Sequence, residues 1–338
     1  MYDSRGHEPP KLMDRGMLDA SRSKGSRVMP AAIETTKLTK WYGHHSRGVI
    51  DVDLVVEAGQ IFGFLGPNGA GKSTTIRLLL DLIRPTSGTA RVLGLDAHRD
   101  RLAIDRRVSY VPGELSLYGD LTGRQLLTYL GNLQGTVDEA YRDKLVERLE
   151  LDTSRRVKTL SRGNKQKVGL VAAFMIRPEL LILDEPTAGL DPFIQLEFEH
   201  LCEEARGEGR TVFISSHQLP EVEHLCDRVG IIREGRLLAV ESIATLKERA
   251  LRKLEIEFGG AVDPAAFAGL PGVQDVVIEK GVLSCTVMGS LDALVKVAAR
   301  FEVVNLRSIE TSLEEIFMAY YGAGDATVVG KEAGHAAA

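Results

Sequence analysis

The sequence predicts an α/β fold in which helices cover a mostly parallel sheet. Two short runs, residues 180–183 and 211–215, consist mainly of apolar or β-branched residues, which is typical of strands buried on both faces. A glycine-rich turn joins an apolar run at 60–65 to apolar residues at helical spacing from Ile76 onward. Because strand and helix patterns alternate over residues 30–240, we expect an α/β sandwich.

Single elements along this region follow from local patterns. Alternating apolar residues predict a half-buried strand before the turn, at Ile50, Val52, Leu54 and Val56. The helix after the turn is expected to stop at Pro85. Asp191 and Pro192 have the residue types of an N-cap and a first helical position, so they predict the start of another helix.

Composition excludes several classes of protein. The chain has 338 residues, of which 44% are hydrophobic and 26% charged, so we expect about two folded domains. A net charge of −5 argues against a general nucleic-acid-binding protein. Three scattered cysteines are too few for a disulfide framework or a zinc site and favour a cytoplasmic chain. No apolar run approaches the ~20 residues of a membrane-spanning helix.

The ends of the chain differ from its middle. Residues 1–29 and 323–338 are expected to be a disordered and a flexible tail, because they lack apolar periodicity. The main domain is expected over residues 30–242. A small α+β domain is expected over residues 250–322.

The order of elements in the small domain indicates a split βαβ unit, which is typical of ferredoxin-like domains. Its expected strands and helices alternate as 254–258 (strand), 264–269 (helix), 273–279 and 282–288 (strands), 291–299 (helix) and 303–309 (strand). A last helix is expected from Ser312, where Glu315 completes a capping box. Its apolar face contains Leu313, Ile316, Phe317 and Tyr320.

The strongest functional signal is Gly66-Pro-Asn-Gly-Ala-Gly-Lys-Ser73, which fits the phosphate-loop pattern G-x-x-x-x-G-K-S. Glycines let backbone amides face phosphate oxygens, and the helix beginning near Gly71 adds its positive dipole end. Lys72 is expected to reach the β- and γ-phosphates, and the Ser73 hydroxyl to bind Mg²⁺. The candidate nucleotide contacts here are Gly66, Pro67, Asn68, Gly69, Ala70, Gly71, Lys72, Ser73 and Thr74.

Two carboxylates follow the buried strand at residues 180–183. Asp184 has the position of the metal-side aspartate of P-loop NTPases. Glu185 is suited to polarise the attacking water. Alone, the pair would fit a solvated acidic turn equally well, but behind a phosphate loop it predicts a hydrolytic site.

A third motif, Leu160-Ser-Arg-Gly-Asn164, opens a helix before these carboxylates. With the other two motifs it resembles the ATP-binding subunit of ABC transporters, whose signature is Leu-Ser-Gly-Gly-Gln. Arg162 and Asn164 depart from that signature, whereas Ser161 and Gly163 keep it. The resemblance implies ATP and Mg²⁺ as ligands, and a P-loop NTPase fold with an inserted helical subdomain.

The same resemblance implies a dimer. Ser161 and Gly163 would contact ATP held by the phosphate loop of a second subunit, either another copy of the chain or a paralogue. Asp191 resembles the family's aspartate that touches this second subunit. His217 resembles the histidine that contacts the γ-phosphate and the attacking water, so the implied catalytic set is Glu185, His217 and Lys72.

Two further positions concern adenine binding and a glutamine that the family has and this chain lacks. Tyr42 resembles the aromatic residue that stacks on adenine, with Trp41 as the alternative. Gly113 stands where the family has a glutamine that binds Mg²⁺ and senses the permease, and the adjacent Glu114 is a possible substitute.

Two surfaces bear on partners. Leu115, Leu117 and Tyr118 lead into the expected helical subdomain and would suit either contact with a permease or plain core packing. A group of basic residues is expected to be a solvated face rather than a nucleic-acid site, because no aromatic residues interleave with it: Arg155, Arg156, Lys158, Arg162, Lys165 and Lys167.

Weaker similarity extends to the C-terminal domain. Its closing Leu313-Glu-Glu-Ile-Phe-Met318 resembles ATPases of drug-resistance exporters, of the kind associated with daunorubicin efflux, whose permease is a separate chain. The resemblance implies a subunit on the inner face of the cell membrane, attached through that permease. The exported substrate would be a drug, a lipid or a polysaccharide-like compound. The alternatives are an importer ATPase with a regulatory C-terminal domain, a protein whose C-terminal domain senses a ligand while its ATPase activity is secondary, and a soluble ABC ATPase without a transport role.

Overall fold

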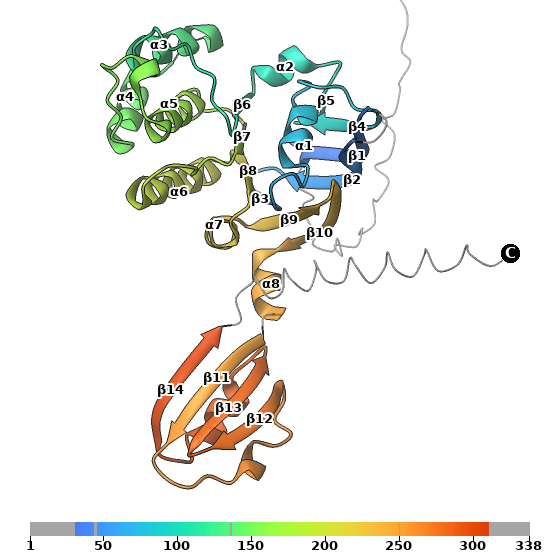
Figure 1. Ribbon diagram of the computed structural model, residues 1–338, viewed down its shortest axis with the longest axis vertical. Coiled ribbons are helices and arrows are strands. Elements are labelled where there is room, and N and C mark those ends of the chain that lie inside the picture. The colour runs from blue at the N-terminus through green and yellow to red at the C-terminus, as the bar shows by residue number, and fades with distance from the viewer. Residues whose placement is uncertain (1–30, 44–45, 136, 250, 311–338) are drawn as a thin grey trace, which may run out of the picture.

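The computed structural model describes residues 31–43, 46–135, 137–249 and 251–310, which form three sheets with helices around them (Figure 1). The predicted tails and the predicted helix from Ser312 lie outside the described residues. None of the described helices has the length and apolar character needed to cross a bilayer.

The central sheet carries the predicted α/β fold. Its strand order is β10-β9-β3-β8-β7-β6, and all neighbours are parallel except β10 and β9. The strands are β3 (Ile61–Leu65), β6 (Val108–Val111), β7 (Leu180–Asp184), β8 (Thr211–Ser216), β9 (Arg228–Arg233) and β10 (Arg236–Ser242). The two apolar runs predicted as doubly buried strands are β7 and β8, neighbours in the middle of this sheet.

An antiparallel sheet packs near the central one, in the order β2-β1-β4-β5. Its strands are β1 (Ala31–Tyr42), β2 (Ser46–Glu57), β4 (Ser87–Val92) and β5 (Leu95–Asp96). The sequence predicted only β2. β4 has one buried residue in six, Val92, and the register of β1 shifts repeatedly. These irregularities obscure the alternation by which strands are recognised.

Helices surround the central sheet in two groups (Figure 1). Those of the first domain are α1 (Lys72–Leu79), α2 (Arg101–Asp105), α3 (Gly123–Gln134), α4 (Glu139–Arg148), η1 (Val157–Thr159), α5 (Arg162–Phe174), α6 (Pro192–Gly207), α7 (Leu219–Leu225) and α8 (Ile243–Arg249). Helix α1 ends at Leu79, before the predicted stop at Pro85, because Asp81 adopts a left-handed φ of 52° that α-helices exclude. Asp191 caps α6 as predicted, with Pro192 as its first residue.

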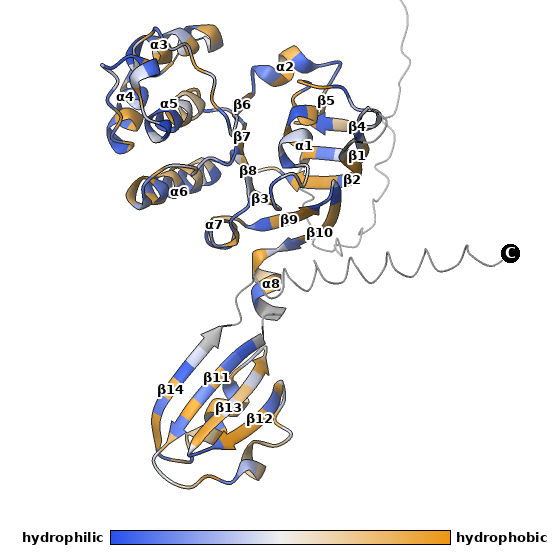
Figure 2. Ribbon diagram, in the orientation of Figure 1, coloured by the Kyte–Doolittle hydropathy of each residue, from blue (hydrophilic) through white to orange (hydrophobic). Residues whose placement is uncertain are grey.

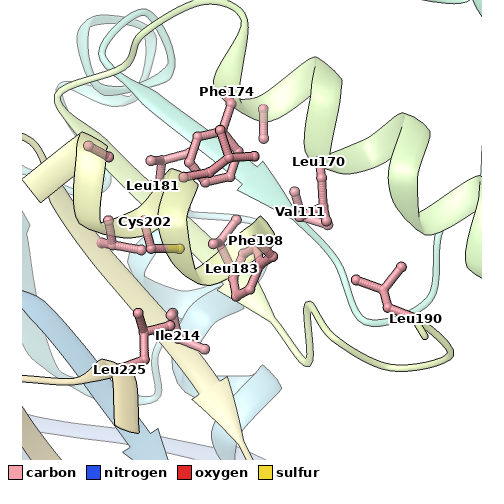
Figure 3. Packing of buried hydrophobic residues seen from close by; sticks show 14 of the residues in the cluster. Val111, Leu170, Phe174, Leu181, Leu183, Leu190, Phe198, Cys202, Ile214 and Leu225 are labelled. Atoms are coloured by element: carbon pink, nitrogen blue, oxygen red, sulfur yellow. The ribbon is translucent and has the colours of Figure 1, made fainter. Parts of the chain in front are cut away.

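The central sheet separates two hydrophobic clusters. Alternate residues of β7 point to opposite clusters: Leu181 and Leu183 pack with the helices α3 to α7, and Ile182 packs with α1 and the antiparallel sheet. Figure 3 shows the first cluster, in which Phe174 of α5 and Phe198 of α6 meet edge to face. Burial on both faces explains why these strands consist of continuous apolar runs.

The C-terminal sheet has the order β12-β13-β11-β14 with every pair antiparallel, which is the arrangement of a split βαβ unit. Its elements are β11 (Leu251–Phe258), η2 (Pro264–Phe267), β12 (Val273–Glu279), β13 (Val282–Met288), α9 (Asp292–Ala298) and β14 (Val303–Glu310). Hydrophobic and hydrophilic residues alternate along β11, as expected for one buried face (Figure 2).

Two expected boundaries need correction. The helix expected over 264–269 is a single 3-10 turn that ends at Phe267, because Ala268 already has an extended backbone with φ −71° and ψ 134°. The first domain was expected to end at residue 242, but Ile243 and Leu246 of α8 are buried in the main hydrophobic cluster. Helix α8 therefore packs with the first domain.

Candidate active site

The phosphate loop, residues 66–73, wraps the N-terminus of α1. Gly69 and Gly71 have φ values of 80° and 110°, which side chains with a Cβ rarely adopt. A Cβ on Gly66 would come within 2.3 Å of the Ile232 carbonyl oxygen, so this position excludes any larger residue. A cavity of about 200 Å³ lies over the loop and is also lined by Gly48 and Glu185. Backbone amides and a helix N-terminus at one cavity suit a bound phosphate.

Lys72 is buried, and its ammonium group has three partners at this cavity. It donates hydrogen bonds to the carbonyl oxygens of Gly66 at 2.7 Å and Pro67 at 3.3 Å. It also lies 3.2 Å from Oε1 of Glu185. The loop therefore holds a desolvated cation in place before any phosphate binds, and a phosphate oxygen would replace these partners with a stronger, charged one.

Glu185 links Lys72 to His217. Its Oε2 accepts a hydrogen bond from Nδ1 of His217 at 2.6 Å, while Oε1 accepts no hydrogen bond and faces the Lys72 ammonium. Its backbone N–H donates to the Ser215 carbonyl oxygen at 3.1 Å. These bonds hold Glu185 at a φ of 50°. A left-handed non-glycine residue costs about 1–3 kcal/mol and points to a constrained functional position.

Asp184 lies behind Glu185 at the end of β7 and is nearly inaccessible. It accepts a hydrogen bond from the Ser215 hydroxyl. Gly113 is its neighbour, since a Cβ there would lie 3.6 Å from Oδ2 of Asp184. Burial and the Asp184 charge raise the pKa of Tyr110 to about 12, so its hydroxyl stays protonated. The side chain of Glu114 is exposed, and no interaction joins it to Asp184.

The donor set fits Mg²⁺ held partly by its substrate. Ser73 and Asp184 offer a hydroxyl and a carboxylate, and Mg²⁺ takes few protein oxygens beside phosphates and waters. Within the part of the chain that the structure describes, no group of three or more His, Cys, Asp or Glu side chains could hold a metal ion alone. At this site the cation would be shared with the phosphates of a bound nucleotide.

Glu221 was missed from the sequence. Its carboxylate accepts hydrogen bonds from the hydroxyls of Ser216 and Thr187, the latter at 3.0 Å. Burial raises the pKa of Glu221, the two hydroxyls oppose this, and the charge of Glu185 adds to it. The sequence signal is weak, because an acidic residue in the first turn of a helix is common.

Tyr42 lies beside Gly48, which lines the cavity. A Cβ on Gly48 would lie 2.9 Å from Cε2 of Tyr42 and 3.1 Å from Cγ2 of Thr74, so the tyrosine ring borders the loop. The Lys40 ammonium lies 5.6 Å from the centre of that ring. Trp41 is 40% exposed, and its backbone N–H donates to the Thr86 hydroxyl at 3.0 Å.

The motif before α5 lies apart from this cavity. Ser161 is exposed and caps α5 by accepting a hydrogen bond from the Asn164 N–H at 3.3 Å. A Cβ on Gly163 would lie 2.4 Å from the Gly189 carbonyl oxygen. Asp191 is likewise exposed at the start of α6, and none of Ser161, Gly163 and Asp191 lines the cavity over the chain's own phosphate loop.

A second missed residue ties α5 to the carboxylate pair. Gln166 is buried, and its Nε2 donates to the Pro186 carbonyl oxygen at 3.0 Å.

Of the residues considered for a permease contact, Leu115 and Leu117 pack against the main cluster. Tyr118 is 61% exposed and meets Tyr129 of α3 edge to face.

Known proteins resemble the chain in both sequence and fold. A family described as ABC transporter matches residues 49–188. The bacitracin transport ATP-binding protein BcrA of Bacillus licheniformis is 41% identical over 232 residues, which cover 68% of this chain and 76% of that protein. The daunorubicin/doxorubicin resistance ATP-binding protein DrrA of Streptomyces peucetius is 38% identical over 64% of this chain and 67% of its own length. A solved ATP-binding subunit of an ABC transporter superposes with a TM-score of 0.58 and 30% identity, over 64% of this chain and 92% of that chain.

Proposed function

The chain belongs to the ABC transporter family, as an ATP-binding subunit whose ATPase activity is coupled to transport, and from this premise we propose that it powers a drug exporter through a separate transmembrane permease. The observation that carries the proposal is the chain of contacts from Lys72 through Glu185 to His217 at the phosphate loop. The names of the bacitracin and daunorubicin/doxorubicin relatives support a drug-like cargo. In this proposal the subunit reaches the membrane only through the permease.

Each residue of this group has a distinct task in ATP hydrolysis. Backbone amides of the loop and Lys72 bind the β- and γ-phosphates and offset charge in the transition state. Glu185 orients a water and accepts its proton as the water oxygen bonds to the γ-phosphorus and the bond to the β-phosphate oxygen breaks. His217 holds the Glu185 carboxylate and contacts the γ-phosphate, while Tyr42 stacks on the adenine. Ser73 and Asp184 would hold Mg²⁺, which supplies further charge neutralisation.

The exposed motif completes the site of another subunit. Ser161, Gly163 and Asp191 lie outside the chain's own cavity but are fixed by capping and close packing. We propose that they contact ATP and the phosphate loop of a second copy or a paralogue, so that two nucleotides lie between two subunits. Closure then depends on γ-phosphate contacts that only the closed dimer makes.

The two structural units have separate tasks in this proposal. The unit ending with α8 binds and hydrolyses ATP, and the sheet from β11 to β14 is an accessory domain. Tyr118 and Tyr129 offer an exposed aromatic pair on the helical subdomain for the permease.

Replacing Glu185 by Gln tests the proposal. The amide keeps the size of the side chain but accepts no proton, so we expect steady-state hydrolysis to fall about 10²–10⁴-fold. ATP binding, measured by isothermal titration calorimetry, should persist. Glu223→Gln is the matched control, because Glu223 pairs with Lys247 away from the loop. Turnover near that of the unmodified chain in Glu185→Gln would remove the proposed base.

The same variant tests the second subunit. Without hydrolysis the γ-phosphate stays, so ATP should convert Glu185→Gln from monomer to dimer in light scattering. Adding Ser161→Arg places a long cation at the proposed contact and should abolish that dimer. A dimer that survives Ser161→Arg contradicts the exchanged arrangement and leaves the hydrolysis result intact.

A further inference from the structure

Glu185 and His217 come from different segments of the chain, so their contact depends on how those segments are held together. Glu185 follows β7, and His217 follows β8. Asp184 and Ser215 are the last pair of the ladder between these strands, so both side chains lie beyond it. His217 is exposed and Glu185 partly exposed, and a bond between two such side chains fixes their geometry only weakly. Their alignment therefore needs support from the surrounding chain.

Glu221 of α7 joins the two segments beyond the last pair of the ladder. Its Oε1 accepts a hydrogen bond at 3.0 Å from the hydroxyl of Thr187, which lies two residues after Glu185. Its Oε2 accepts a hydrogen bond from the hydroxyl of Ser216, which directly precedes His217. Each hydroxyl has one proton to donate, and a carboxylate offers two acceptor oxygens. One side chain thus bridges the segment of the base and the segment of the histidine.

The Ser216 end of this bridge is tied to the backbone on both sides of His217. The Ser216 hydroxyl oxygen accepts a hydrogen bond from the Gln218 N–H at 2.9 Å. The Ser216 carbonyl oxygen accepts one from the N–H of Gly66, the first residue of the phosphate loop, at 3.2 Å. Because these bonds surround His217, a change at the Glu221 carboxylate would shift the backbone that carries the histidine.

We propose that Glu221 is a positioning residue for ATP hydrolysis, which keeps Glu185 and His217 aligned by bridging the segments that carry them. This inference rests on the proposed function, because it requires Glu185 to be the base. Glu221 does not line the cavity over the phosphate loop, so it acts through its partners. A misplacement of about 1 Å at reacting groups can cost ~100-fold in rate. Loss of either hydroxyl contact should therefore lower kcat, while the loop still binds ATP.

Removing the Thr187 hydroxyl in the full-length chain tests this role with little change in shape. Thr187→Val exchanges the hydroxyl for a methyl group, whereas Thr187→Ser keeps the hydroxyl. We expect kcat to fall at least ~10-fold in Thr187→Val and to recover most of that loss in Thr187→Ser. The Kd for ATP, measured by calorimetry, should stay unchanged in both variants. An unaltered kcat in Thr187→Val overturns the proposal.

A buried threonine elsewhere in the fold separates positioning from a merely structural role. The Thr35 hydroxyl is also buried and donates to the Val52 carbonyl oxygen at 2.8 Å within the antiparallel sheet. Thr35→Val should therefore lower Tm, yet leave kcat unchanged when it is measured well below Tm. Equal losses of kcat in Thr35→Val and Thr187→Val would show an effect of stability alone and would overturn the proposal.

Substitutions at Glu221 give a second result. Glu221→Leu removes both acceptors and should lower kcat at least as far as Thr187→Val does. Adding Thr187→Val to it should cause no further fall, because contacting residues that act as a unit are not additive. Glu221→Gln keeps one acceptor oxygen and gains an amide that can donate to the other hydroxyl oxygen, so it should retain most of kcat. Additive losses in the double variant overturn the proposal, and the Thr187 pair decides alone if Glu221→Leu does not fold.

Failure of this inference is distinct from failure of the proposed function. If Glu185→Gln abolishes hydrolysis while Thr187→Val leaves kcat intact, Glu185 remains the base and only the positioning role of Glu221 is lost.

Discussion

The two halves of the proposed ATP site are built differently. At the phosphate loop, Lys72 and His217 each contact Glu185, at 3.2 Å and 2.6 Å, and the loop's own carbonyl oxygens hold the cation. At the start of α5, Ser161 is exposed, and its partner within the chain is the helix that it caps. The phosphate loop and its contacts enclose the place where a phosphate would bind, whereas the start of α5 is exposed to solvent.

This difference separates catalysis from control. Lys72 is already held at the loop and needs only to exchange partners when phosphate binds, so nucleotide affinity should depend mainly on the loop. A rigid but exposed motif gains partners only when another surface arrives, so the second half is suited to report dimer closure. Gln166 and Gly163 connect the halves, since both pack against the loop that follows Glu185.

Lys72→Ala should have the largest effect on this comparison. It removes hydrogen bonds from a cation to phosphate, each contributing about 1.5–3 kcal/mol, so ATP affinity should fall at least ~100-fold by calorimetry. Lys158→Ala is the control, because Lys158 is exposed and its ion pair with Asp120 does not involve the phosphate loop. Unchanged affinity in Lys72→Ala would place phosphate recognition elsewhere.

The parts of the fold that the sequence predicted are those fixed by local patterns. Continuous apolar runs predicted β7 and β8, the motif at residues 160–164 predicted the start of α5, and Asp191 predicted the cap of α6, because a helix start depends on one side chain and the next turn. The antiparallel sheet was missed because β1 and β4 pair with distant residues through irregular registers. Pairing of this kind is decided by tertiary contacts rather than by a strand's own residues.

The same distinction applies to the site. Loop residues and the carboxylate pair were predicted because their chemistry follows one strand or one turn. Glu221 and Gln166 could not be predicted, since each matters only through a partner brought close by folding, Thr187 for one and Pro186 for the other. Gly163 was predicted as a contact to a ligand, and the structure adds a tight packing role against Gly189.

Gly163→Ala should show how firmly the two halves are joined. The new methyl group would overlap the Gly189 carbonyl oxygen, so the chain must shift, at a cost of about 1–3 kcal/mol. We expect a lower Tm and slower hydrolysis. Gly207→Ala at the end of α6 is the matched control, because nothing lies within 4 Å of the added Cβ, and the change should stabilise by about 0.5–1 kcal/mol. Equal Tm values for the two variants would mean that the chain around Gly163 and Gly189 accommodates the methyl group without loss of stability.

Glu221→Gln should have the smallest effect, seen only as a change in pH dependence. Because the pKa of Glu221 is raised above its ordinary 4.5, the folded chain binds more protons than the unfolded chain just above that value. Stability from this group is therefore lost as pH rises through its raised pKa. Measured against Glu221→Gln, the Tm of the unmodified chain should fall by a few degrees over that interval, whereas exposed Glu203→Gln should track the unmodified chain. Parallel Tm curves for Glu221→Gln and the unmodified chain would show that the Ser216 and Thr187 hydroxyls fully offset the burial, and that the carboxylate behind Glu185 is ionised at no cost.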